Sequence, residues 1–298
     1  MRALVTGGAG FIGSHLVDVL VAAGDDVAVV DHLSKGHTHN LAGAIDAGIE
    51  LIRADVSDVR AMIAAFESTR PEVVFHLAAQ VDVRRSVDDP STDAHVNVGG
   101  TAAVLEAARL CGTPRAVLAS TAGVYGDPEV LPTPEAAPVA PLSPYGASKA
   151  AAESYMELYR RLHGMSTLTL RMANVYGPRQ DPHGEAGVVA IFSGVRADGR
   201  VATIYGDGRQ TRDYVFVEDV VNAFAAAGRS SAEGILNIST GVETSVSELA
   251  AAMQVPTESR PSRPGEVRRS CLSPRRAAEV LGWRARTALD EGLPQTLA

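Results

Sequence analysis

Residues 3–13 read Ala-Leu-Val-Thr-Gly-Gly-Ala-Gly-Phe-Ile-Gly, an apolar run followed by glycines at positions 7, 10 and 13. This pattern is typical of a strand, a tight turn and the start of a helix. In that context a glycine-rich turn lets the backbone approach a pyrophosphate at the helix N-terminus. Glycine also serves ordinary turns and tight packing, so the assignment depends on the residues that follow.

Short apolar runs alternate with stretches of helical periodicity through the first half of the chain. The runs are Ala3 to Thr6, Val27 to Asp31, Ile49 to Arg53, Val73 to Leu77, Ala116 to Ser120 and Thr167 to Arg171. This alternation predicts a parallel sheet. The nearly continuous apolar character of the runs indicates strands covered on both faces. We therefore expect an α/β protein with a Rossmann-type doubly wound parallel sheet.

After residue 172 the alternation weakens, and glycine, proline and arginine become more frequent. We expect residues 1–172 to form a dinucleotide-binding domain that also receives part of 211–240. Residues 173–298 are predicted to form a smaller, irregular α/β lobe that binds the substrate.

The composition excludes several functional classes. The 298-residue chain has a formal net charge of -8, which disfavours nonspecific binding to nucleic acid or anionic lipid. Its two cysteines lack the clustering of a metal site, so we expect no metal and free thiols. Without a long apolar stretch or an N-terminal signal pattern, we expect a cytoplasmic protein with no membrane partner.

An acidic residue strengthens the interpretation of the glycine-rich turn. Asp31 ends the second predicted strand, at the distance expected for a contact with the ribose of a dinucleotide. A carboxylate there repels a 2'-phosphate, so NAD is favoured over NADP, although Lys35, His37 and His39 nearby weaken this preference. The predicted cofactor-binding residues are Gly7, Gly10, Phe11, Ile12, Gly13, Asp31, Asp55, Val56, Leu77, Ala78, Ala79, Tyr145 and Lys149. For Asp55, a helix N-cap is the alternative to an adenine contact, and His76 is expected to be structural.

A tyrosine and a lysine share one face of a predicted helix. Ser143 is a natural N-cap and Pro144 fits the first turn, which places Tyr145 and Lys149 at positions i and i+4. A phenol with a pKa of about 10 needs a nearby positive charge to act as a base near neutral pH. The segment after the fifth predicted strand adds a hydroxyl, either Thr121 or Ser120.

These motifs resemble the extended short-chain dehydrogenase/reductase family, and within it the nucleotide-sugar epimerases, over nearly the whole chain. The resemblance implies that Tyr145 is the base, that Lys149 binds the nicotinamide ribose, and that Thr121, or Ser120 in another register, assists. It implies an NAD-dependent isomerase that epimerises C4 of a UDP-hexose, UDP-glucose or UDP-galactose, through a transient 4-keto sugar. Related dehydratases and decarboxylases carry acids after that hydroxyl, where this chain has Ala122 and Gly123.

The resemblance also assigns residues to the UDP-sugar. Asn174 and Arg212 are expected at the diphosphate, with Arg263 as a second arginine and Glu266 at the ribose. Guanidinium groups suit phosphate oxygens, and surface salt bridges are the alternative for both arginines. Val188, Ile191 and Phe192 are candidates for the uracil pocket or for the core, and Thr121 and Tyr145 also touch the sugar.

Three questions stay open in the sequence. Ser270 lies near the family's gate for the sugar 2-substituent, which makes a UDP-N-acetylhexosamine an alternative substrate. Arg84 or Arg85 is a candidate partner for the carboxylate of UDP-glucuronate, another alternative, and an NAD-binding regulator without catalysis is the third. The resemblance further suggests a homodimer through helices starting at Ala94 and Pro144. Its candidate contacts, which are equally compatible with the core, are Val104, Leu105, Met156 and Tyr159.

Overall fold

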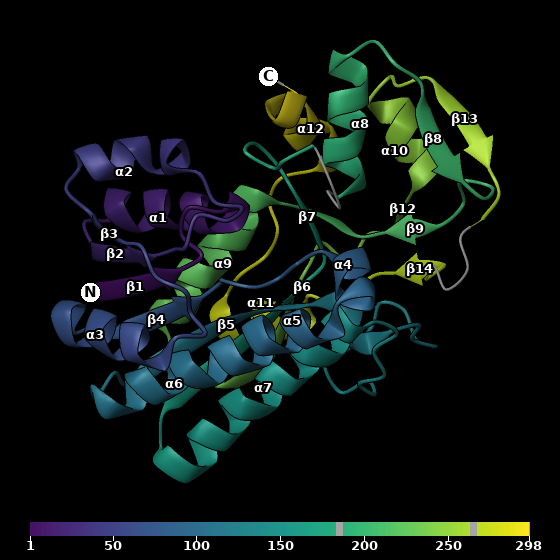
Figure 1. Cartoon of the computed structure of the whole chain (residues 1–298). Coiled ribbons are helices and arrows are strands. Elements are labelled where there is room, and N and C mark those ends of the chain that lie inside the picture. The colour runs from purple at the N-terminus through teal and green to yellow at the C-terminus, as the bar shows by residue number, and fades with distance from the viewer. Residues whose placement is uncertain (183–186, 263–266, 298) are drawn as a thin grey trace.

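The computed structural model describes residues 1–182, 187–262 and 267–297. A seven-stranded sheet has the strand order β11-β6-β5-β4-β1-β2-β3, and all of its strand pairs are parallel (Figure 1). The strands are β1 (Arg2–Thr6), β2 (Asp26–Val30), β3 (Glu50–Ile52), β4 (Val73–His76), β5 (Arg115–Thr121), β6 (Ser166–Met172) and β11 (Gly234–Ile238). The order reverses between β1 and β4, and such a switch point is where α/β sheets bind ligands.

Side chains of the strands feed two separate cores, one on each face of the sheet. In β1, Val5 packs with the cluster that includes Leu16, whereas Leu4 packs with the cluster that includes Phe66. Successive strand residues point to opposite faces. Because each face has its own core, consecutive residues such as Leu4 and Val5 are both apolar. This explains the nearly continuous apolar runs in the sequence and confirms the predicted doubly wound fold.

Helices cover both faces of the sheet. On one face α1 (Phe11–Ala22) packs against α9 (Val217–Arg229), and on the other lie α3 (Val59–Thr69), α6 (Gly100–Leu110) and α7 (Pro144–His163) (Figure 1). The remaining helices of this part are α2 (Ala42–Asp46), α4 (Val83–Asp88), α5 (Pro90–Ala94) and α11 (Arg275–Leu281). A π-helical turn at His95–Gly99 joins α5 to α6, so the helix predicted from residue 94 begins four residues earlier.

The start and end of α7 follow from its sequence. The Ser143 hydroxyl accepts a hydrogen bond from the Gly146 amide, and Pro144 occupies the first turn. The helix ends at His163, and the next residue, Gly164, adopts a left-handed conformation with φ of 67°. These caps determine which turn carries Tyr145 and Lys149.

The remaining elements form small sheets and helices to one side of the large sheet (Figure 1). They are β7 (Asn174–Tyr176) with β10 (Tyr214–Phe216), β8 (Ala202–Tyr205) with β13 (Thr257–Arg260), and β9 (Thr211–Arg212) between β12 (Thr244–Ser245) and β14 (Arg269–Ser270). Three helices accompany them: α8 (Val188–Ala197), α10 (Val246–Ala252) and α12 (Leu289–Leu297). Between these segments the chain returns to the large sheet through α9 and β11. No described helix has both the length and the apolar composition needed to cross a bilayer.

The contacts suggested for a dimer need correction. Val104, Leu105 and Met156 are almost fully buried within the monomer, in the cluster between the sheet and α3, α6 and α7. Tyr159 is partly buried, and its hydroxyl donates a hydrogen bond to Glu106. The first three residues therefore belong to the core. The large apolar side chains that α7 does expose are Tyr155, Leu158 and Leu162.

Candidate active site

Close backbone packing shapes the glycine-rich turn after β1. Gly7 has φ of 71°, and a Cβ atom there would lie 2.7 Å from the Ala78 amide nitrogen. A Cβ on Gly13 would collide with the Gly7 carbonyl oxygen. Gly10 precedes α1, and no side chain of the described residues caps this helix. The first-turn amides, including those of Phe11 and Ile12, are thus left for an anionic group, which suits a pyrophosphate.

Asp31 lies directly beside this turn. Its side chain is buried, and its two carboxylate oxygens accept hydrogen bonds from the Ala9 amide at 3.0 Å and the Leu33 amide at 2.8 Å. A carboxylate has about four acceptor positions, so two hydrogen bonds leave room for ribose hydroxyls.

Asp55 follows β3 and does not cap the next helix, so that alternative is wrong. The N-cap of α3 is Asp58, whereas Asp55 accepts hydrogen bonds from the amide and hydroxyl of Ser57. Partial burial alone would raise the pKa of Asp55, but these hydrogen bonds, together with His32 and His95, lower the pKa. The next residue, Val56, is buried against Gly100.

His76 is structural, as expected. It is fully buried, with Nδ1 2.7 Å from the Thr6 hydroxyl and Nε2 3.1 Å from the Thr101 hydroxyl. Thr101 donates its proton to the Asn97 carbonyl, so His76 must donate from Nε2 and accept at Nδ1. Burial lowers the His76 pKa to about 3, so the ring is neutral. Because Thr6 also accepts from the Ala78 amide, this network places the segment Leu77, Ala78 and Ala79 beside the glycine-rich turn.

Thr121, Tyr145 and Lys149 lie together at the end of β5. The Thr121 hydroxyl is hydrogen-bonded to the Tyr145 phenol and also accepts from the Gly123 amide at 3.1 Å. Burial raises the Tyr145 pKa to about 12; the hydrogen bond to Thr121 acts in the opposite direction, and the Asp93 carboxylate raises the pKa further. In the free protein this phenol is therefore protonated near neutral pH.

Lys149 is buried with no hydrogen bond or ion pair to any residue in the described part of the chain. Burial lowers its pKa to about 8, although the Glu153 and Asp93 carboxylates oppose the shift. An ammonium group in such a place needs acceptors. Ribose hydroxyls of a dinucleotide seated on the glycine-rich turn would supply them, so the residues present fit such a cofactor.

Ser120, the alternative to Thr121, points elsewhere. Its hydroxyl donates to Glu153 Oε1 at 2.5 Å, and its side chain is fully buried. Of these two hydroxyls, it is the one on Thr121 that contacts Tyr145.

The residues assigned to the sugar nucleotide are partly brought together. In the three-stranded sheet, Arg212 of β9 pairs with Thr244 and with Ser270, so Ser270 lies beside this arginine. The Arg212 side chain is half-buried and donates to the Thr211 carbonyl at 2.7 Å. Asn174 begins β7, and its backbone N–H donates to the Asp213 carbonyl. Arg263 and Glu266 lie outside the described residues.

The apolar candidates for the uracil pocket divide between two environments. Phe192 is buried in the core, which was the alternative to a uracil contact. Val188 at the start of α8 is half-buried, and Ile191 is exposed. Val188 therefore remains a candidate, and Phe192 does not. Arg84 and Arg85 lie on α4.

Sequence reasoning missed three buried charged side chains: Asp93 and Glu153, whose carboxylates act on Lys149, and Arg171, which pairs with Glu153. The signal for Glu153 was its position four residues after Lys149. The signal for Arg171 was a charge inside an otherwise uncharged strand. Asp93 gave no signal, because its neighbours Gln80 and Asn97 carry no pattern that links them to it in the sequence.

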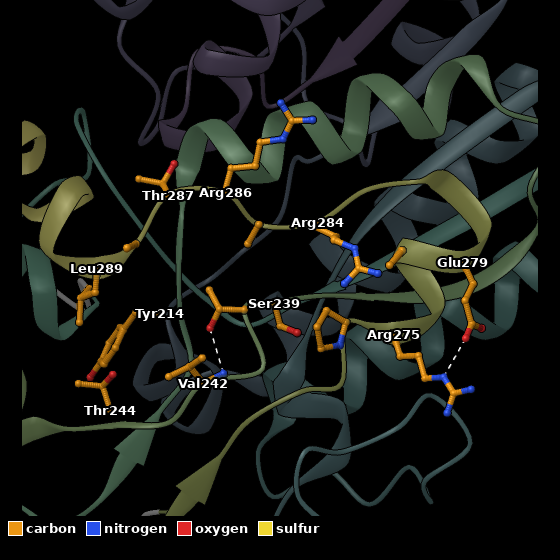
Figure 2. A pocket seen from close by; sticks show the side chains of 15 residues that line it. Tyr214, Ser239, Val242, Thr244, Arg275, Glu279, Arg284, Arg286, Thr287 and Leu289 are labelled. Atoms are coloured by element: carbon orange, nitrogen blue, oxygen red, sulfur yellow. Dashed lines mark hydrogen bonds and ion pairs between the residues drawn. The ribbon is translucent and has the colours of Figure 1, made fainter.

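A cavity of about 790 Å³ lies elsewhere, between the end of β11, α11 and the segment before α12 (Figure 2). Its lining includes Tyr214, Thr240, Arg284 and Arg286, but none of the residues predicted to bind cofactor or sugar. The candidate active site is therefore the place where Thr121, Tyr145 and Lys149 meet at the end of β5, and not this cavity. Within the described ranges, no group of His, Cys, Asp and Glu residues is arranged to hold a metal ion.

Comparisons with known proteins show which family this chain belongs to. The model of the family described as GDP-mannose 4,6 dehydratase matches residues 4–296. A UDP-glucose 4-epimerase of Mycolicibacterium smegmatis is 52% identical over 308 residues, covering 100% of this chain and 97% of that protein. The structure of a Thermotoga maritima UDP-glucose 4-epimerase with UDP-glucose has a TM-score of 0.95 at 43% identity, covering 100% of this chain and 97% of that one. A Thermus thermophilus UDP-glucose 4-epimerase in complex with NAD has a TM-score of 0.93 at 44% identity, covering 100% and 98%.

The doubly wound sheet and the Thr–Tyr–Lys cluster define a short-chain dehydrogenase/reductase of the extended type. The predicted resemblance is confirmed by the full-length matches. The chain belongs to the family described as GDP-mannose 4,6 dehydratase, and within it groups with the nucleotide-sugar epimerases.

Proposed function

We propose that this protein catalyses the NAD-dependent epimerisation of a UDP-hexose at C4, interconverting UDP-glucose and UDP-galactose. The observation that carries the proposal is the contact between the Thr121 hydroxyl and the Tyr145 phenol, one helical turn before Lys149, whose buried ammonium has no hydrogen bond or ion pair among the described residues. Support comes from relatives named for this activity that match the full chain.

The residues that would hold NAD are on α1, at the end of β2 and on α7. The first-turn amides of α1 suit the pyrophosphate, Asp31 suits the adenosine ribose, and Lys149 suits the nicotinamide ribose. Bound NAD supplies a hydride acceptor for C4 of the sugar. Its positive nicotinamide also lowers the pKa of a neighbouring phenol.

Tyr145 is the proposed base for the sugar 4-hydroxyl. The phenolate would accept the hydroxyl proton while C4 gives up its hydride to the bound NAD. Loss of both would leave a 4-keto sugar, and Tyr145 would return the proton when the hydride is returned. Thr121 donates a hydrogen bond that stabilises the phenolate, in line with its lowering of the Tyr145 pKa. Lys149 adds a positive charge in a buried setting, where its effect is stronger than in water.

Inversion requires that the ketose turns while the nucleotide stays bound. We propose Arg212 and Asn174 as anchors for the diphosphate and Val188 as part of the uracil pocket. Arg263 and Glu266 remain predicted second anchors. A guanidinium is the preferred partner for phosphate oxygens, and such fixed contacts leave the hexosyl group as the part that rotates.

Epimerisation is favoured over dehydration by the residues after Thr121. Loss of a sugar hydroxyl as water requires an acid to protonate the departing oxygen. Ala122 and Gly123 follow Thr121 in a 3₁₀ turn and carry no acidic group. Proton and hydride transfer at C4 are the steps that this site equips.

We further propose that the protein is a homodimer and that it resides in the cytoplasm. On α7, Tyr155, Leu158 and Leu162 are exposed at spacings of three and four residues, which form one apolar stripe. A second copy of α7 would cover this stripe as in a helical bundle. Both cysteines are free thiols, which fits a reducing compartment.

The deciding experiment is to incubate the purified protein with UDP-galactose and no added NAD, and to follow the anomeric protons by NMR. UDP-glucose should appear with the wild type and not with Tyr145→Phe, while that variant keeps bound NAD. Equal activity of this variant would refute Tyr145 as the base. If the wild type is silent on UDP-galactose, UDP-glucuronate and a UDP-N-acetylhexosamine are tested next. Retained NAD with no turnover of any sugar would indicate a regulator.

A further inference from the structure

Three side chains form a buried ionic cluster behind the catalytic residues. Glu153 accepts hydrogen bonds from Arg171 Nη2 at 2.6 Å and Nε at 2.9 Å, and from the Ser120 hydroxyl at 2.5 Å. All three residues are almost completely buried. A carboxylate, a guanidinium and a hydroxyl are thus locked together in the interior.

The cluster joins the elements that carry the proposed catalytic groups. Glu153 is one helical turn beyond Lys149 on α7, and these residues lie on the same side of the helix. Ser120 immediately precedes Thr121 in β5, and Arg171 is in the neighbouring strand β6, where it is the register partner of Ser120. Glu153 therefore ties the end of β5 to α7.

Stability alone is a poor reason for this arrangement. Burying an ion pair costs desolvation, and replacing such pairs by apolar residues is often neutral or stabilising. In this cluster Arg171 Nη1 has no hydrogen-bond partner among the described residues. Its guanidinium instead lies 4.6 Å from the centre of the Tyr125 ring. Apolar side chains could fill the same space without this desolvation cost, so the charged cluster calls for a reason other than stability.

We propose that Glu153 is a positioning residue for the epimerisation. Through Ser120 and Arg171 it holds α7 in register with β5, so that the Tyr145 phenol stays within hydrogen-bond distance of the Thr121 hydroxyl and the Lys149 ammonium stays at the same edge. The inference rests on the proposed function. It adds a residue that touches neither the sugar nor the cofactor.

The charge of Glu153 supplies a second observable. Two carboxylates face Lys149, Glu153 from its own helix and Asp93 from α5. The titratable side chain of His76 from β4 also faces it and is neutral. Both carboxylates raise the Lys149 pKa against the effect of burial. Removing one of them should therefore make Lys149 lose its proton at lower pH.

The test is Glu153→Gln, which keeps the shape of the side chain and removes its charge. Because small misplacements of reacting groups cost up to about 100-fold in rate, we expect kcat to fall roughly 10- to 100-fold with little change in KM. We also expect the alkaline limb of the pH–rate profile to move to lower pH. Bound NAD, read from absorbance after denaturation, should be kept at neutral pH.

Arg115→Met is the matched control. Arg115 is also a buried arginine, at the opposite end of β5, where it donates to the Ala227 carbonyl and the Ser166 hydroxyl. This variant should lower the melting temperature without moving the pH profile. If Glu153→Gln behaves in the same way, with wild-type kcat and an unmoved alkaline limb, the cluster is structural only and the proposal is wrong.

Ser120→Ala keeps the proposal testable if Glu153→Gln fails to fold. It removes one hydrogen bond and leaves the ion pair intact, and we expect a severalfold loss of kcat with KM unchanged. Wild-type kcat in Ser120→Ala would overturn the inference. Failure of the proposed function is distinguishable, because then the wild type itself turns over no UDP-sugar.

Discussion

The Thr121 hydroxyl is hydrogen-bonded to the Tyr145 phenol, across the gap between the end of β5 and the first turn of α7. Because this contact lowers the Tyr145 pKa, the hydroxyl acts as a donor to the phenolate. The Gly123 amide donates to the same hydroxyl oxygen and holds it in place. The strand thus provides the group that stabilises the charged form of a helix residue.

Thr121→Val tests this contact, since it replaces the hydroxyl by a methyl group of similar size. A hydrogen bond to a charged group is worth about 1.5–3 kcal/mol, so kcat should fall roughly 10- to 100-fold at neutral pH. Without the donor the Tyr145 pKa rises, so the acid limb of the pH–rate profile should move to higher pH. The profile of kcat against pH measures both effects.

The control is Thr113→Val, because the buried Thr113 hydroxyl has no hydrogen-bond partner in the described structure. This change should leave the profile unmoved and should not lower the stability. An unchanged profile in Thr121→Val as well would remove the assigned role of the hydroxyl.

Lys149 predicts a pH dependence of cofactor retention. Burial lowers its pKa to about 8, so the ammonium form is complete only well below pH 8 and disappears above it. We expect the wild type to lose NAD as the pH rises through this value, measured by gel filtration and absorbance. Lys149→Met should retain little NAD at any pH; full retention in this variant would contradict a contact with the nicotinamide ribose.

The same lysine should lower the stability of the NAD-free protein. An exposed lysine in the unfolded chain has a pKa of about 10.4. Because the folded-state pKa is lower, the unfolded state binds more protons between the two values, and stability rises with pH across that window. At pH 7, below both pKa values, Lys149 is charged in both states, so the full cost of burying its charge is subtracted from the free energy of unfolding. NAD-free Lys149→Met should therefore melt at a higher temperature than the NAD-free wild type.

The glycine-rich turn allows a paired substitution. Gly13→Ala places a Cβ against the Gly7 carbonyl, which should open the turn and abolish NAD binding. Gly43→Ala is the control, because a Cβ atom on this glycine of α2 would have no atom of the described structure within 4 Å. That change should stabilise the protein by about 0.5–1 kcal/mol. Thermal unfolding and bound NAD distinguish the two, and equal NAD contents would refute the steric explanation.

The exposed stripe on α7 predicts the oligomeric state. Leu158→Glu with Leu162→Glu should convert the proposed dimer into a monomer, because charges cannot be buried unpaired in a helical interface. Sedimentation velocity measures the change. Val280→Glu on α11, also an exposed apolar residue, is the control and should leave the dimer intact. A wild type that sediments as a monomer would refute the proposed dimer.

The parts of the site that were predictable depend on local sequence. Gly7, Gly10 and Gly13 are recognisable because a turn and a helix start impose their spacing. Tyr145 and Lys149 are recognisable because Ser143 and Pro144 fix the helix that carries them. The parallel sheet was predictable for a similar reason, since strands covered on both faces need consecutive apolar residues.

The rest depends on contacts that sequence does not display. The sequence shows two adjacent hydroxyl residues, Ser120 and Thr121, and does not tell which of them faces the site. In the structure the Ser120 hydroxyl turns inward and donates to Glu153. Val104 and Met156 are apolar helix residues of the kind that also form dimer interfaces, but in the structure the sheet covers them. Asp55 resembles a cap in the sequence, whereas the first-turn amides of α3 donate to Asp58.

The late position of β11 in the chain has a consequence for biosynthesis. This strand covers the open edge of β6, yet it is made only at residues 234–238. While the ribosome is still making the intervening segments, the nascent sheet has an unpaired edge, and α9 is not yet present over the apolar face. Unpaired edges recruit other strands. A recombinant fragment ending near residue 172 should therefore aggregate, and the nascent chain should depend on chaperones until the final strand emerges.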